Sequence, residues 1–202
     1  MSQPRPTSKF RNVKLRTATI PANKRFHRLF LDIYPDPLGF GKSPSRFSDP
    51  RRRIVANRFG VLYLGESLKV CFLEALLRDE RNGAVGDYPL AEAELRRRLY
   101  AEINVARALT LVDLRGDAAI RMGVPSDVAR ASRQSLARAW SVAFYEHPEA
   151  PDGVIYPSRL NMETNLAIYD RAVPKLKLSG LIRLIDAPDL PSVLDELAVA
   201  IV

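Results

Sequence analysis

The sequence predicts an α+β protein, in which short strands and helices share one hydrophobic core. The strand candidates are short apolar or alternating runs, whereas the helix candidates carry apolar residues at a spacing of three and four. These segments do not follow a strict strand-helix-strand order, so we do not expect a doubly wound parallel sheet. With 202 residues, the chain is long enough to bury the core of a single domain.

The first 24 residues are expected to form a basic arm. They contain Pro4, Pro6 and Pro21 among scattered lysines and arginines, a composition typical of an extended or poorly ordered terminus. The alternating run Phe26 to Leu31 is typical of a strand. We therefore place the folded domain at residues 25–202.

A long loop and a strand-helix pair follow this first strand. Residues 34–50 contain four prolines and two glycines, and ordered loops of this length in compact domains are often functional. Residues 60–64 are a buried-strand candidate. A helix is predicted from Ser67 to Glu80, with Ser67 as its N-cap.

The second half of the chain is expected to add strands and helices to the same core. Trp140 is interpreted as a core residue, because it belongs to an apolar stripe with helical spacing. The predicted elements are a loop at 82–89, a helix at 91–98, strands within 99–114 with a turn near Ala106, helical turns at 116–122, a helix at 132–146, strands at 153–158 and 165–169, a strand at 181–185 and a helix at 191–201.

Composition excludes several classes of protein and site. No apolar run approaches the roughly 18 to 20 residues of a membrane span, and the N-terminus lacks the apolar core of a signal peptide. Cys71 is the single cysteine, and the chain has two histidines, His27 and His147. We therefore expect a cytoplasmic protein with no internal disulfide, no metal site and no membrane association.

Positive charge is concentrated in the first part of the chain. Residues 1–60 hold 14 Lys or Arg against 3 Asp or Glu, whereas the remainder holds 17 against 20. Such a segment suits a nucleic acid, an acidic protein or a phosphate-bearing small molecule, and it is equally compatible with a solvated surface. Charge alone does not choose among these partners.

Glu74 is the first candidate for chemistry, because it lies at the apolar face of the helix predicted from Ser67. An unpaired carboxylate in such a position costs several kcal/mol unless it has a partner or a task. An ion pair with Arg78, one helical turn later, is the ordinary alternative.

Four residues near predicted strand ends are further candidates. Arg28 lies inside the first strand, Arg46 in the long loop, Tyr63 inside the strand before the helix, and Ser158 directly after a later strand. An arginine in the middle of a strand suits a phosphate or carboxylate ligand, because the guanidinium group can donate two hydrogen bonds to either.

The order of these residues resembles the RES domain family, which is named for its Arg, Glu and Ser. The resemblance covers roughly residues 25–185. The matching pieces are His27-Arg28, Ser45-Arg46-Phe47-Ser48, Leu62-Tyr63-Leu64-Gly65, Phe72-Leu73-Glu74, and Gly153 to Ser158 followed by the apolar segment Asn165 to Tyr169. Ser48 stands where the family commonly has asparagine, and residues 82–98 look like an insertion.

The resemblance implies a single domain similar to ADP-ribosyltransferases such as diphtheria toxin, with a mixed central sheet flanked by helices. It implies NAD as the substrate and an enzyme that cleaves the nicotinamide–ribose bond by hydrolysis or phosphorolysis. In this reading Arg28 and Arg46 hold the NAD phosphates, and Ser48, in the same loop as Arg46, also belongs to the NAD-binding residues. Tyr63 stacks on the nicotinamide, Glu74 stabilises the ribosyl transition state, and Ser158 positions the ribose or the catalytic side chains.

The resemblance also implies the partners of this protein. Members of the family are toxins of bacterial toxin–antitoxin pairs, and an Xre-like antitoxin blocks the active site. One alternative is a mono-ADP-ribosyltransferase that modifies a cellular protein. Another is a nucleic-acid-binding module that uses Arg51, Arg52 and Arg53, although we expect no direct DNA binding. A catalytically inert interaction protein is the third.

Overall fold

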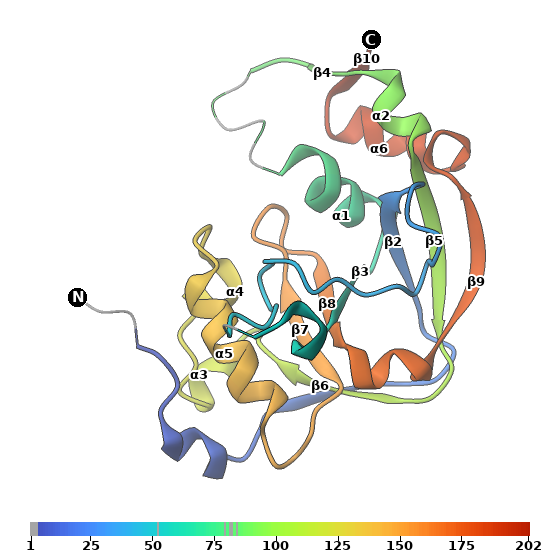
Figure 1. Cartoon of the computed structure of the whole chain (residues 1–202). Coiled ribbons are helices and arrows are strands. Elements are labelled where there is room, and N and C mark those ends of the chain that lie inside the picture. Colours follow the sequence, from blue (N-terminus) through green and yellow to red (C-terminus); the bar gives the residue numbers. More distant parts are fainter. Residues whose placement is uncertain (1–3, 52, 79, 81–82, 84) are drawn as a thin grey trace.

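The computed structural model describes residues 4–51, 53–78, 80, 83 and 85–202. It confirms the α+β class, because a mixed sheet of eight strands is flanked by helices (Figure 1). The strand order is β1-β6-β7-β8-β3-β2-β5-β9, and β4 and β10 form a separate parallel pair. The strands are β1 (Thr17–Ile20), β2 (Arg25–Leu31), β3 (Val61–Gly65), β4 (Tyr88–Leu90), β5 (Arg98–Val105), β6 (Leu109–Asp113), β7 (Gly153–Pro157), β8 (Thr164–Tyr169), β9 (Leu176–Arg183) and β10 (Val199–Ile201).

The helices form two groups at opposite ends of the sheet (Figure 1). One group packs beside β6 and β7, and the other gathers with β4 and β10. None of the helices in the described part of the chain is both long and apolar enough to cross a membrane. The first group is α3 (Ala118–Arg121), α4 (Asp127–Arg130) and α5 (Ser135–Tyr145), and the second is α1 (Leu68–Phe72), α2 (Glu92–Arg96) and α6 (Leu190–Glu196).

Each helical group has its own hydrophobic cluster. Trp140 and Phe144 of α5 are buried against the sheet together with Phe47 from the long loop, which confirms Trp140 as a core residue. A second cluster joins α1, α2 and α6. Apolar side chains on the other face of the sheet form a third cluster. The site described below lies where the regions covered by the two helical groups meet.

The sheet opens between β2 and β3. The two strands share a single registered pair, His27 with Gly65, whereas β2 pairs with β5 at seven positions and β3 with β8 at five. The backbones therefore diverge on one side of this pair, and side chains from both strands can face the space between them. Gly65 is required here, because an added Cβ would lie 2.6 Å from Val70 and 2.7 Å from Cys71.

Helix α1 begins as the sequence predicts and ends earlier. The Ser67 hydroxyl accepts a hydrogen bond from the Val70 N–H at 3.1 Å, which confirms the predicted N-cap. After Phe72 the helix becomes a π-helical segment, Leu73–Leu77, rather than continuing to Glu80. Arg78 follows with φ 38°, a left-handed backbone conformation that ends the helix.

The described part of the N-terminal arm, residues 4–24, is folded onto the domain. Strand β1 pairs with β6, and the ring of Phe10 packs edge-on against Trp140 at 4.9 Å. The Trp140 indole N–H also donates to the Pro4 carbonyl at 3.1 Å. These long-range contacts supply the order that the local composition does not predict.

Residues 82–98 lie partly outside the described residues, since 82 and 84 are not described. The remainder contains strand β4 and helix α2, so the expected loop to residue 89 ends in a strand. That this segment is an insertion stays a prediction.

Two elements near the C-terminus differ from their predictions. Strand β9 begins at Leu176, five residues before the predicted start at 181, because it pairs with β5 from Leu99 to Val105. Helix α6 ends at Glu196, and the predicted continuation to residue 201 instead forms β10 beside β4. Pairing partners far away in the sequence decide both boundaries. Helix α4, before the predicted helix at 132–146, is an additional element.

Candidate functional site

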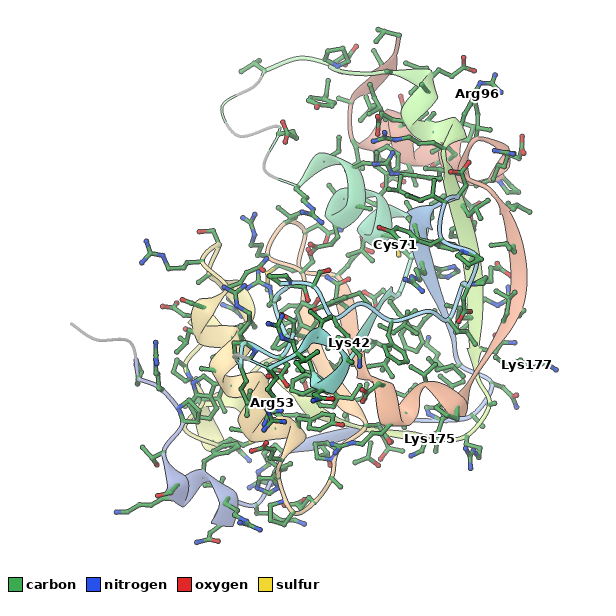
Figure 2. All side chains as sticks on the ribbon, viewed as in Figure 1. Lys42, Arg53, Cys71, Arg96, Lys175 and Lys177 are labelled. Atoms are coloured by element: carbon green, nitrogen blue, oxygen red, sulfur yellow. The ribbon has the colours of Figure 1, made fainter. Side chains whose placement is uncertain are left out.

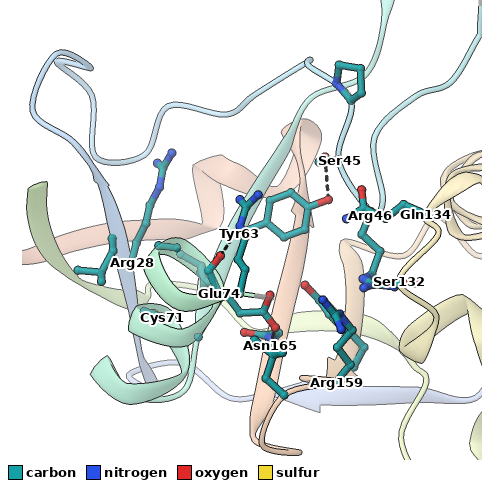
Figure 3. Close-up of a pocket in the computed structure, with 18 residues that line it drawn as sticks. Arg28, Ser45, Arg46, Tyr63, Cys71, Glu74, Ser132, Gln134, Arg159 and Asn165 are labelled. Carbon is teal, nitrogen blue, oxygen red and sulfur yellow. Dashed lines mark hydrogen bonds between the residues drawn. The ribbon is translucent and has the colours of Figure 1, made fainter. Parts of the chain in front are cut away.

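A cavity of about 350 Å³ opens where β2 and β3 diverge (Figure 3). Its size lies at the lower end of the range of small-molecule sites, roughly 300–1,000 Å³. Side chains from both strands, the long loop, the π-helical segment and the β7–β8 hairpin line it. The lining residues used below are Arg28, Ser45, Arg46, Tyr63, Gly65, Cys71, Glu74, Arg78, Ser132, Gln134, Tyr156, Arg159 and Asn165.

Glu74 reaches this cavity from the π-helical segment. Such segments occur mainly as single turns and are frequent at functional sites. The Glu74 side chain is half-buried, and its Oε1 atom accepts hydrogen bonds from the Ser158 hydroxyl at 2.8 Å and from the Asn165 amide at 3.0 Å. Two donors on one oxygen fix the orientation of the carboxylate.

Arg78 does not provide the carboxylate ion pair that the sequence leaves open as the ordinary alternative. Its Nε atom donates to the backbone carbonyl of Glu74 at 2.8 Å. This contact lies at the end of the helix. The Glu74 carboxylate itself accepts its hydrogen bonds from side chains of the β7–β8 hairpin. Arg78 also lines the cavity.

Ser158 lies behind Glu74 rather than in the cavity wall. It is fully buried, its hydroxyl donates to Glu74, and the same oxygen accepts from the Leu160 N–H at 3.2 Å. Of the two roles that the family resemblance implies, this geometry suits the positioning of a catalytic side chain. Contact with a ligand is the less direct of the two, because Ser158 is not a lining residue.

The two arginines named by the sequence lie on opposite sides of Tyr63 (Figure 3). Arg28 donates to the Pro37 carbonyl at 2.6 Å, and its guanidinium lies 5.1 Å from the centre of the Phe30 ring. Burial lowers the pKa of Arg28 to about 10. Arg46 donates to the Ala131 carbonyl at 2.8 Å. Backbone carbonyls therefore orient both cations, as an anion-binding site requires.

Tyr63 fastens the long loop to the sheet. Its hydroxyl accepts from the Phe47 N–H at 2.8 Å and lies 2.9 Å from the Ser45 hydroxyl. Burial raises the pKa of Tyr63, so the side chain remains a neutral phenol. The hydroxyl is thus occupied within the protein, while the residue still lines the cavity.

Ser48 is not brought to the cavity. It is 1% exposed, accepts from the Ser45 N–H at 2.9 Å and donates to the Ser45 carbonyl at 3.0 Å. These bonds close a tight turn around Arg46. Its position supports the shape of the loop, and direct contact with a ligand at Ser48 is not indicated by its surroundings.

Asn165, Tyr156 and Arg159 line the cavity but are not among the site residues expected from sequence. Asn165 and Tyr156 both lie within segments that the family pattern includes, and their pairing across β7 and β8 brings them together. A strand position says which face a side chain takes only when the partner strands are known. The sequence feature that could have identified Tyr156 as a site residue is its position directly before Pro157-Ser158.

Among the described residues, arginines are the commonest charged side chains of the cavity lining. Four arginines line the cavity, with Glu74 as the one acidic lining residue among the described part of the chain. Such a cavity can hold a phosphorylated or carboxylated ligand, and the fixed carboxylate can stabilise positive charge that develops on it. No group of three or more potential metal ligands occurs among the described residues.

In the described part of the chain, basic side chains outside the cavity lie in separate places. Arg51 is paired with Asp49 at 2.7 Å and with Glu146, and Arg52 lies outside the described residues. Figure 2 shows Arg53 near the helices of the first group, whereas Lys177 points outward from the opposite edge of the sheet. This distribution gives little support to an extended nucleic-acid surface.

Comparisons with known proteins show what this chain is similar to. The family model described as the RES domain matches residues 21–193. The probable toxin y4kH of Sinorhizobium fredii (strain NBRC 101917 / NGR234) is 41% identical over 127 residues, which are 62% of this chain and 100% of that protein. A chain in the crystal structure of the M. tuberculosis MbcT–MbcA toxin–antitoxin complex has the same fold, with a TM-score of 0.62 and 19% identity over 89% of this chain and 91% of that one.

Proposed function

The chain belongs to the RES domain family, and on this premise we propose that it is the toxin of a toxin–antitoxin pair that consumes NAD. The proposed reaction breaks the bond between nicotinamide and its ribose. The observation that carries the proposal is Glu74, a carboxylate fixed by two hydrogen bonds at the wall of a cavity lined by four arginines.

This constellation suits the chemistry of NAD cleavage. Nicotinamide leaves NAD as a neutral ring, so its departure needs no general acid, while positive charge develops on the ribose. A preorganised carboxylate stabilises that charge. Glycosidases that expel poorer leaving groups use two carboxylates, one of which is an acid. One carboxylate at Glu74 is therefore enough for the proposed reaction.

The cations have a separate task. Arg28 and Arg46 line the cavity, and each donates a hydrogen bond to a backbone carbonyl. We assign them to the pyrophosphate of NAD, because one guanidinium group can donate two parallel hydrogen bonds to the oxygens of a phosphate. We assign the ring of Tyr63, which lines the same cavity, to contact with the nicotinamide end.

Nicotinamide release tests the proposal. Purified protein incubated with NAD should release nicotinamide, and Glu74→Ala should abolish release while the variant keeps the thermal unfolding profile of the wild type. Parallel reactions with and without inorganic phosphate separate phosphorolysis from hydrolysis. NAD that stays intact in both conditions contradicts the proposed reaction.

Transfer of ADP-ribose to a protein is the alternative within the same chemistry. Labelled NAD added to a cell lysate distinguishes the two, since protein-bound label indicates a mono-ADP-ribosyltransferase. Free ADP-ribose or its phosphorylated form indicates NAD consumption.

We also propose that a cognate Xre-like antitoxin neutralises this protein by covering the cavity. Arg28, Arg46 and Arg78 line the cavity and favour an acidic inhibitor segment. Co-expression should relieve growth inhibition by the wild-type chain, and the purified complex should release no nicotinamide. A complex that remains fully active contradicts blockage of the cavity.

A further inference from the structure

Tyr156 lies in one cross-strand row with residues of the proposed site. In the register of the sheet, Asn165 of β8 is paired with Gly65 of β3 on one side and with Tyr156 of β7 on the other. Directly paired residues point to the same face, with Cβ atoms about 4.5–5.5 Å apart. Tyr156 is therefore the immediate neighbour of Asn165, whose amide holds Glu74.

The surroundings of Tyr156 leave its hydroxyl available. The residue is 6% exposed, and its ring packs edge-on against Phe47 with 4.9 Å between centroids. It lines the cavity, and no described residue makes a hydrogen bond to its hydroxyl. The hydroxyl oxygen is not one of the buried, unpartnered side-chain atoms of the described residues, so the oxygen is accessible from the cavity although the ring is buried.

The two tyrosines of the cavity differ in this respect. The Tyr63 hydroxyl is already bonded to Ser45 and to the backbone of Phe47. Burial raises the pKa of Tyr156 well above its ordinary value, and the nearby Tyr63 and Glu74 raise it further. Tyr156 therefore stays protonated and can donate a hydrogen bond into the cavity.

We propose that the Tyr156 hydroxyl binds substrate directly, by donating a hydrogen bond to a hydroxyl of the nicotinamide ribose. The proposal rests on the proposed function. Glu74 is ionised when it stabilises a cation and can then only accept hydrogen bonds, whereas Tyr156 donates. A single group between them must accept from one and donate to the other, and a sugar hydroxyl does both.

Tyr156→Phe tests this assignment, because it removes the hydroxyl and keeps the ring that packs on Phe47. Three substrates are compared: NAD and two analogues that lack the 2′- or the 3′-hydroxyl of the nicotinamide ribose. With NAD we expect kcat/KM to fall about tenfold, as for one lost hydrogen bond. With the analogue that lacks the contacted hydroxyl, wild type and variant should be equal. For each substrate we compare the kcat/KM of the variant with that of the wild type, so that the intrinsic reactivity of the analogue cancels.

Tyr145→Phe is the matched control. The Tyr145 hydroxyl donates to Asp170 at 3.3 Å, away from the cavity lining, so this variant should keep wild-type kinetics. Two results would overturn the assignment: Tyr156→Phe with the activity of the wild type, or an equal loss with all three substrates, which indicates a structural role.

Failure of the proposed function is distinguishable from failure of this assignment. If wild-type protein releases no nicotinamide, the proposed cleavage is wrong, and calorimetry with NAD decides the role of Tyr156. Binding that is about tenfold weaker in Tyr156→Phe then supports the contact. Equal affinity, or no binding to the wild type, overturns it.

Discussion

The wall of the cavity that carries Arg46 and the wall that carries Glu74 face the same space, but different contacts hold them. Arg46 belongs to a loop without regular secondary structure, which Phe47 anchors in the core with 0% exposure. The Ser141 hydroxyl also donates to the Phe47 carbonyl at 2.6 Å. Glu74 instead depends on two polar side chains that are remote in the sequence.

This difference teaches which property each wall controls. Apolar burial and backbone hydrogen bonds hold the loop, so substitutions there should mainly lower the free energy of unfolding. Side-chain hydrogen bonds hold the carboxylate in the wall that carries Glu74, so substitutions of these side chains should mainly lower activity. The following variants test that division, beginning with the largest expected effect.

Glu74→Gln should have the largest effect on activity. Glutamine keeps the size of the side chain and removes its charge, so the ribosyl cation loses its stabilising carboxylate. We expect nicotinamide release to fall on the order of 100- to 1,000-fold, with less than about 1 kcal/mol change in the free energy of unfolding. A variant that keeps a tenth of the wild-type rate would show that charge at Glu74 is not essential.

Phe47→Ala should have the largest effect on stability. Truncation of a fully buried phenylalanine costs about 3–5 kcal/mol, measured as the shift in the urea unfolding midpoint. Pro44→Ala is the control in the same loop, because Pro44 is exposed, and it should cost under about 1 kcal/mol. Equal stability of the two variants would mean that Phe47 does not anchor the loop.

Ser158→Ala should reduce activity more than stability. It removes one of the two donors to Glu74 Oε1 and leaves the Asn165 amide in place. Hydrogen bonds to charged groups contribute about 1.5–3 kcal/mol, so we expect kcat to fall at least tenfold. Ser179→Ala, whose hydroxyl bonds to the Glu102 carbonyl on β5, serves as the control. A kcat unchanged by Ser158→Ala would contradict the positioning role.

Tyr63 lies on strand β3 and bonds to the loop that carries Arg46. The substitution Tyr63→Phe should have a smaller effect on activity than the variants above. Loss of its hydroxyl leaves the Phe47 N–H without its partner and loosens the loop around Arg46. We expect the KM for NAD to rise severalfold while kcat changes less, together with a loss of about 1–3 kcal/mol in unfolding free energy. A fall in kcat alone would place the hydroxyl in the chemistry instead.

Alkaline pH should weaken binding without unfolding the domain. Burial lowers the pKa of Arg28 to about 10, so the folded protein loses this cation as pH rises through about 10. Deprotonation of a base with a lowered pKa favours the folded state, and unfolding is not its consequence. Calorimetry with ADP-ribose should show a severalfold loss of affinity between pH 8.5 and 10.5. Arg28→Gln should lack this step, and a wild type without it would exclude Arg28 from anion binding.

Local patterns predicted much of the fold. The N-cap at Ser67, the strand around Arg28 and the buried stripe of α5 all depend on neighbours within a few residues. The early start of β9 and the C-terminal strand β10 could not be predicted, because pairing with β5 and β4 determines them. The arm is ordered for the same reason, through Phe10 and β1.

The candidate site shows the same limit. The sequence placed Arg28, Arg46, Tyr63 and Glu74 in one group, and all four line the cavity. It did not separate Ser48, which closes a turn, from residues that face the cavity. Asn165 and Tyr156 were missed, because their place beside Glu74 depends on the register of β7, β8 and β3.

The separation in sequence between Glu74 and its two donors, 84 residues to Ser158 and 91 to Asn165, sets when the candidate site can be assembled during synthesis of the chain. A ribosome has to complete most of the chain before the β7–β8 hairpin exists. The nascent chain already carries the carboxylate and both arginines, but nothing yet holds the carboxylate in place. The candidate site is therefore complete only after the last quarter of the chain has begun to fold onto the rest.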